Sequence, residues 1–148
     1  MVFGDSQLMK QLTDIVWPEV KRLIGLEMKK AEREALENNR VICLIESAVL
    51  VEAGWQSGID EVWVVDVSSE EQRIERLCKR NQLTVEEAKQ RVRSQLGAQQ
   101  VIQQLEEHNQ GLEQKERLKV VYIDTFGKTV QNVKDDATKL FEQFLMQK

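Results

Sequence analysis

Residues 46–66 read ESAVLVEAGWQSGIDEVWVVD, and short apolar runs rich in β-branched residues lie at its two ends, at 41–45 and 62–67. Such runs are typical of strands that a parallel sheet buries on both faces. Glu46 directly follows the first run, and open α/β sheets form their ligand crevices at the carboxyl ends of their strands. The stretch therefore predicts the middle of an α/β domain, with a carboxylate near a ligand site.

The segment before this stretch has the apolar spacing of helices. Asp5 can cap a first helix, and Pro18 is expected to begin a second helix that ends near residue 37, because the fixed φ of proline suits the first helical position. Within the central stretch, residues 50–53 are expected to form a short helical turn that Gly54 ends.

Two capping boxes follow, Ser68 with Glu71 and Thr84 with Glu87. In this pattern a hydroxyl and a carboxylate three residues apart bind the unpaired backbone N–H groups at the start of a helix. We therefore expect one helix after Ser68 and another after Thr84. The second helix either continues or breaks near Gly97.

A third apolar run at 120–123 and a helical pattern at 129–146 complete the chain. Helices that alternate with strands predict an α/β layer with a parallel sheet. Three strands make a thin sheet, so we expect the parent domain to have further strands that precede this sequence.

The composition is that of a globular chain, with 41% hydrophobic and 31% charged residues among 148. A net charge of −4 gives no reason to expect nucleic-acid binding, and no apolar run reaches the about 18 residues of a membrane span. Cys43, in the first expected strand, and Cys78 are expected to be free thiols. With one histidine and no cysteine cluster, a zinc site is not expected.

Residues 126–129 read FGKT after a strand and before a helix, which imitates a phosphate loop. A true phosphate loop needs a glycine five residues before the second glycine, and Tyr122 stands there. We therefore expect a strand-to-helix turn closed by Gly127.

Three other groups of residues each leave two interpretations open. Glu46 and Glu52 flank the apolar loop, and Glu46 either holds a magnesium ion through water or only ends the strand or pairs with a lysine. Trp55 and Trp63 are core or rim aromatics or ligand platforms. Trp17, next to Pro18, can form a hydrophobic staple at the start of a helix. The cations on the two helices after Asp66 are phosphate ligands or a solvated face: Arg73, Arg76, Lys79, Arg80, Lys89, Arg91 and Arg93.

Three pieces of the sequence carry a family resemblance: VFGDSQLMKQLTDIVWPEV at 2–20, LIESAVLVEAGWQSGIDEVWVVDV at 44–67 and EEQRIERLCKRNQLTVEEAKQRVRSQ at 70–95. Together they resemble dephospho-coenzyme A kinases, and most closely the kinase domain of animal bifunctional coenzyme A synthases. The last piece contains the family's glutamine and two arginines at spacings of four, followed by an arginine and a glutamine.

The resemblance implies a P-loop-kinase-like three-layer α/β domain over residues 1–148, with a helical lid at about 69–104. It implies ATP, Mg²⁺ and dephospho-coenzyme A as ligands, and the last step of coenzyme A biosynthesis as the reaction. Glu46 takes a catalytic part through water on the metal, and no residue here binds the metal directly. The residues implied to face ATP are Arg76, Arg80, Arg91 and Gln95, and those implied to face the substrate are Trp17, Leu50 and Glu52.

The family's phosphate loop and first strands would precede Met1 of this sequence. We therefore expect negligible kinase turnover from the 148 residues alone. The alternative is a non-catalytic binding or scaffold chain that pairs with a partner supplying the missing strands. The resemblance places the protein in the cytoplasm or the mitochondrion.

Overall fold

The computed structural model describes residues 6–38 and 41–146, and the chain forms two compact units, Met1–Ser57 and Gly58–Lys148. The single domain expected over residues 1–148 stays a prediction.

The first unit begins with one long helix, α1, Ser6–Asn38, which continues through Pro18. The prediction that Pro18 begins a second helix was therefore wrong. Asp5, the expected cap of the first helix, lies outside the described residues. Proline removes only the backbone bond to the carbonyl of Asp14, at a cost of about 3 kcal/mol in a helix interior. A helix of 33 residues keeps its other turns on both sides of that gap.

A tight turn and a tryptophan pair follow in the same unit. The Ala53 N–H donates to the Val49 carbonyl (2.9 Å), and Gly54 has a φ of +67°, which confirms the short helical turn that this glycine ends. Trp55 is buried, and its ring meets that of Trp17 edge-on at a centroid distance of 6.2 Å. Trp55 is therefore a core aromatic.

The strand predicted at 41–45 is not present, which corrects the expected three-stranded sheet. Leu44 is 90% exposed and Ile42 47% exposed, and Cys43 is also exposed rather than buried. A run of apolar residues becomes a strand only where a neighbour accepts and donates its backbone hydrogen bonds. Among the described residues no strand pairs with this run.

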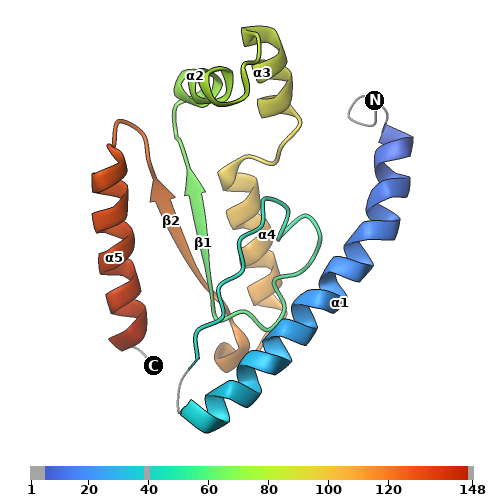
Figure 1. Cartoon of the computed structure of the whole chain (residues 1–148), viewed down its shortest axis with the longest axis vertical. Coiled ribbons are helices and arrows are strands. Elements are labelled where there is room, and N and C mark those ends of the chain that lie inside the picture. The colour runs from blue at the N-terminus through green and yellow to red at the C-terminus, as the bar shows by residue number, and fades with distance from the viewer. Residues whose placement is uncertain (1–5, 39–40, 147–148) are drawn as a thin grey trace. The chain divides into compact units, whose positions relative to one another are not determined.

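The second unit contains a two-stranded parallel sheet of β1, Glu61–Asp66, and β2, Lys119–Asp124. The register runs from Glu61 opposite Lys119 to Asp66 opposite Asp124. Val62 and Val64 of β1 are buried with Ile123 of β2. Figure 1 shows both strands ending toward α2 and α3, so an α/β arrangement with a parallel sheet is confirmed.

Helix α2, Glu70–Asn81, begins one residue later than its capping box predicted. Ser69, not Ser68, is the N-cap, and its hydroxyl accepts from the Gln72 N–H (3.2 Å). The shift occurs because the Ser68 N–H is already bound to Asp124 (3.0 Å). The helix ends at Gln82, whose φ of +54° is left-handed and costs a non-glycine residue energy.

Helix α3, Val85–Arg93, packs against α2 to form a helical hairpin, and Ala88 is fully buried in it. The capping box of Thr84 and Glu87 is confirmed, with the Thr84 N–H donating to the Glu87 carboxylate at 2.8 Å. Of the two alternatives left open at Gly97, the structure shows the break, because α3 ends at Arg93 and Gly97 caps the next helix.

Helix α4, Ala98–Gln110, covers β1 and buries Leu105 completely. Near its end, the Asn109 side chain donates to the Leu118 carbonyl (2.8 Å) and accepts from the Leu118 N–H (3.0 Å). A short 3₁₀ turn, Gln114–Glu116, lies between the two residues. Asn109 thus holds the backbone just before β2 begins.

The last helix, α5, Val130–Met146, follows a turn in which Gly127 has a φ of +65°. This confirms the turn predicted in place of a phosphate loop. Lys128 of the turn pairs with Asp136 (2.9 Å). Each helix among residues 6–38 and 41–146 is too short or too polar to cross a lipid bilayer.

Replacing Asn109 with Ala is expected to destabilise the second unit by about 1–3 kcal/mol, because Leu118 is 3% exposed and both its backbone groups would lose their partner. Urea unfolding followed by circular dichroism measures the change. The matched control is Gln110→Ala, an exposed residue at the end of the same helix, which should change stability by less than about 0.5 kcal/mol. Equal stability of the two variants would contradict the clamp.

Candidate active site

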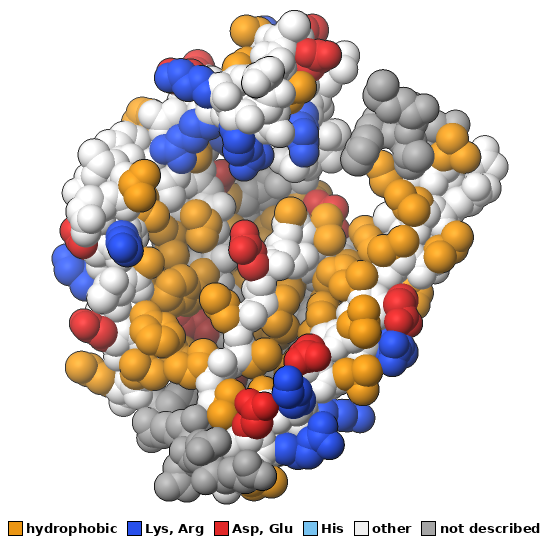
Figure 2. All heavy atoms as spheres, viewed as in Figure 1, with side chains coloured by type: hydrophobic (Ala, Val, Ile, Leu, Met, Phe, Trp, Pro, Cys, Tyr) orange, Lys and Arg blue, Asp and Glu red, His pale blue; other side chains and the backbone are white. Residues whose placement is uncertain are grey.

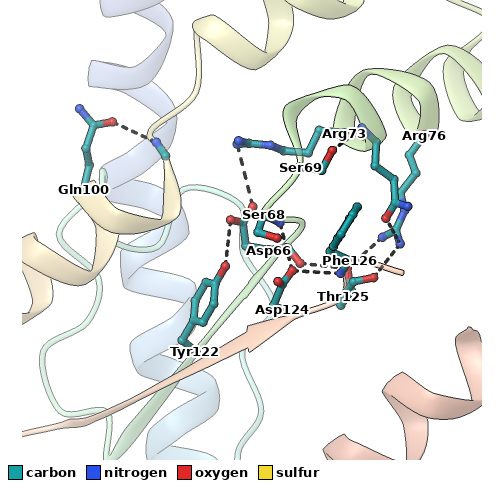
Figure 3. A network of polar contacts seen from close by, with 12 residues as sticks. Asp66, Ser68, Ser69, Arg73, Arg76, Gln100, Tyr122, Asp124, Thr125 and Phe126 are labelled. Carbon is teal, nitrogen blue, oxygen red and sulfur yellow. Dashed lines mark hydrogen bonds and ion pairs between the residues drawn. The ribbon is translucent and has the colours of Figure 1, made fainter. Parts of the chain in front are cut away.

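The candidate site lies where the carboxyl ends of β1 and β2 meet helix α2 (Figure 3). The parallel register places Asp66 and Asp124 opposite each other as the last residues of the two strands. Ligands of open α/β sheets bind outside this end of the strands. The polar groups gathered here are therefore the first place to look for function.

Asp124 joins the two loops that leave the strands. One carboxylate oxygen accepts from the Phe126 N–H and from the Ser68 N–H, both at 3.0 Å. The bond from Phe126, and then those from Ser68, lower the pKa of Asp124 below its ordinary value, because each donor favours the charged carboxylate. An ionised Asp124 thus fixes the start of both loops.

Thr125 continues the sheet beyond the last strand residue. Its N–H and its hydroxyl both donate to the Asp66 carbonyl, each at 2.9 Å, and the residue is 6% exposed. From α2, Arg76 donates to the Thr125 hydroxyl (2.9 Å) and to the Thr125 carbonyl (3.0 Å). Helix α2 is therefore tied to the end of the sheet through Thr125.

The Asp66 carboxylate lies between a tyrosine and a second arginine. Tyr122 donates its hydroxyl proton to Asp66 (3.4 Å), and a guanidinium nitrogen of Arg73 lies 4.0 Å from the other oxygen. The Nε of Arg73 is buried without a hydrogen-bond partner. Partial burial of Tyr122, followed by the charges of Asp66 and Asp124, raises the pKa of Tyr122.

The residues predicted to face ATP differ in their surroundings. Arg76 belongs to the network just described. Arg80, one turn later in α2, binds the neighbouring Asn81 through its Nε (3.0 Å). The guanidinium of Arg91, in the last turn of α3, makes no hydrogen bond or ion pair with any other residue that the structure describes, and the Arg91 backbone carbonyl accepts from the Ser94 hydroxyl (3.0 Å). Gln95 is exposed just after α3.

The remaining predicted residues all belong to the first unit. Trp17 packs on Trp55, and Leu50 accepts the Trp55 N–H with its backbone carbonyl (2.9 Å). Glu46 is exposed before the turn, and Glu52 is exposed within it. Their roles toward the metal and the substrate stay predictions.

Basic side chains gather on the surface formed by α2 and α3 (Figure 2). Within the described parts of the chain, no group of three or more His, Cys, Asp or Glu side chains is placed to hold a metal ion. The basic side chains on α2 and α3 are of the type that binds anions.

Four members of the network were not among the predicted site residues: Asp66, Tyr122, Asp124 and Thr125. The sequence contains one indication of the two aspartates, because each directly follows a run of apolar residues, as Glu46 does. The pairing between them depends on the register of β1 with β2, which no local pattern contains.

Comparison with known proteins identifies the family. The model of the dephospho-CoA kinase family matches residues 1–107. The chain belongs to the dephospho-CoA kinase family. The match contains α1, the loop with Glu46 and the α2–α3 hairpin, and it agrees with the extent of the resemblance seen in the sequence.

Curated dephospho-CoA kinases from bacteria are similar over parts of their length. The enzyme of Staphylococcus haemolyticus is 38% identical over 96 residues, which are 65% of this chain and 45% of that protein. That of Staphylococcus epidermidis is 31% identical over 143 residues, 97% of this chain and 60% of the relative. The chain thus spans about half the length of the dephospho-CoA kinases it matches.

Asp66→Asn is expected to lower the pKa of Tyr122, because the substitution removes one of the negative charges that disfavour the phenolate. Tyr122 is the only tyrosine of the chain, so the absorbance of tyrosinate in a pH titration reports it alone. Asp136→Asn, which removes a carboxylate paired with Lys128, serves as the control and should leave the titration unchanged. An unchanged Tyr122 pKa in the Asp66 variant would rule out the contact.

Asp124→Asn should lower stability at neutral pH, and the difference from the native chain should shrink in acid. Because folding lowers the pKa of Asp124, its stabilisation is present above the ordinary carboxyl pKa of about 3.9 and is lost as the pH falls through the lower folded-state value. Unfolding measured from neutral pH into that acid range tests this. A difference that stays constant with pH would refute the role of the charge.

Proposed function

We propose that this chain forms part of an ATP-dependent dephospho-CoA kinase, which transfers the γ-phosphoryl group of ATP to the ribose 3′-hydroxyl of dephospho-CoA. The family match supports the activity. The observation that carries the proposal here is the group of basic side chains on α2 and α3 (Figure 2), in which Arg73 and Arg76 of α2 reach the carboxyl ends of β1 and β2. The cytoplasm or the mitochondrion is proposed as its compartment from the family resemblance alone.

In this proposal Arg80 and Arg91 bind the triphosphate from the α2–α3 hairpin. Guanidinium groups form charge-assisted hydrogen bonds to phosphate oxygens and stabilise the charge of the transferring phosphoryl group. Gln95 contributes a neutral donor next to Arg91. Trp17, Leu50 and Glu52 face the coenzyme A substrate.

Magnesium would arrive bound to the phosphates of ATP, where it neutralises negative charge on the β- and γ-phosphates. Glu46 is proposed to reach such an ion through a water molecule. The described residues include no cluster that could hold the ion by itself. The contribution of the chain is therefore to orient the nucleotide and the substrate.

We further propose that the 148 residues alone have negligible kinase turnover. In P-loop enzymes, backbone N–H groups and a lysine of a glycine-rich loop hold the β- and γ-phosphates. The sequence contains no such loop, because its one Gly-Lys-Thr, at 127–129, lacks the upstream glycine. A partial site can still bind ATP through its arginines.

Calorimetric titration of the chain with ATP, together with an assay of coenzyme A formation, tests the proposal. We expect weak ATP binding without measurable turnover. Arg91→Met should weaken binding about tenfold, the loss of a charge-assisted hydrogen bond. Arg93→Met, an exposed arginine on the same helix, is the matched control and should have little effect. Measurable coenzyme A formation would overturn the claim of inactivity.

A scaffold role is the second candidate, and the exposed run at 41–45 favours it. Leu44 and Ile42 of this run are largely open to solvent and unpaired with any described strand. Backbone groups in that state can pair with a strand from a partner. Failure to bind both ATP and dephospho-CoA would favour this role over the kinase.

A further inference from the structure

Arg76 differs from the other arginines of the hairpin in how its guanidinium is used. One terminal nitrogen donates to the Thr125 hydroxyl (2.9 Å), and the other donates to the Thr125 carbonyl (3.0 Å) and to the Gln72 side chain (3.0 Å). Figure 3 shows the side chain reaching from α2 to the loop after β2. Both terminal nitrogens are therefore engaged inside the protein.

The acceptor of these bonds is itself fixed. Thr125 is 6% exposed, and its N–H and hydroxyl both donate to the Asp66 carbonyl at the end of β1. The hydroxyl therefore has its proton committed to Asp66 and accepts only from Arg76. These hydrogen bonds link α2 through Thr125 to β1, and Thr125 is shielded from water.

Arg80 and Arg91 have no comparable attachment in the part of the chain that the structure describes. The Arg80 side chain binds Asn81, the next residue along its own helix, and the Arg91 guanidinium makes no bond to another described residue. Their guanidinium groups can bind a phosphate without giving up a contact to the sheet. Arg76 would have to release Thr125 first.

We propose that Arg76 is a positioning residue, which couples α2 to the loop at 125–129 so that the two open together. It is not a phosphate ligand, in contrast to the role implied by the family resemblance. The proposed coupling follows from hydrogen bonds within the chain itself. Only its consequence for ATP rests on the proposed function.

Hydrogen exchange measured by mass spectrometry on the chain without ligand tests the coupling. Arg76→Met should speed exchange about tenfold or more in both α2 and residues 125–129, since hydrogen bonds to charged groups are worth that much in an opening equilibrium. Thr125→Val keeps the side-chain shape but removes the hydroxyl, so it should speed exchange in the same two segments, and to a smaller extent. Arg76→Lys keeps one donor and should restore part of the protection.

The matched control is Lys79→Met, which removes a cation of α2 that is paired only with Glu75 on the same helix. It should leave residues 125–129 unchanged. Faster exchange confined to α2 in the Arg76 variant, or unchanged α2 in the Thr125 variant, would overturn the coupling. Should Arg76→Met fail to fold, the nearly isosteric Thr125→Val still decides the question.

Titration with trinitrophenyl-ATP separates positioning from direct contact. A positioning role predicts that Thr125→Val weakens binding although every arginine remains, and that Arg76→Met leaves the salt dependence of binding as in the native chain. If Arg76 bound a phosphate directly, Thr125→Val would leave binding unchanged and Arg76→Met would reduce its salt dependence. Those two results would overturn the proposal. If the native chain binds no nucleotide, the proposed kinase function fails while the exchange experiment still tests the coupling.

Discussion

The in-register parallel pairing of β1 with β2 is the constraint on which the second unit depends. It sets Asp66 opposite Asp124 and brings the two loops that follow within reach of one carboxylate. The N–H groups of Ser68 and Phe126, which lie beyond the strand pairing, find their hydrogen-bond acceptor in Asp124. With the loops fixed, α2 starts at Glu70 and directs Arg73 and Arg76 onto the sheet.

Sequence reasoning identified those elements whose signals are local. The strands β1 and β2 and the capping box at Thr84 were predicted within a residue or two, since each depends on neighbours along the chain. The run at 41–45 was misassigned because a strand also needs a partner that no local pattern guarantees. Pro18 was misassigned because its preference for a first turn is weaker than the continuity of a long helix.

In the candidate site, too, residues with local sequence signals were predicted and contacts that depend on the fold were not. A family resemblance pointed to the arginines of α2 and α3, and the family match now covers them. It could not show that Arg76 binds Thr125, since the two residues lie 49 positions apart and meet only because the sheet brings the loop after β2 next to α2. Arg76 and Arg80 lie one turn apart on α2 but differ in their contacts. The Arg76 guanidinium is bound within the fold, whereas the terminal nitrogens of Arg80 are left for solvent or an anion.

The left-handed Gln82 has a mechanical consequence. Glycine at such a corner would let the chain sample many orientations, whereas a glutamine at a φ of +54° restricts them. Together with the capping box that follows, this makes the angle between α2 and α3 stiff. Arg91 therefore moves only with the hairpin as a whole, whose position is set by the chain at Ser69, by the short segment before Gly97 and by the contact of Arg76 with Thr125.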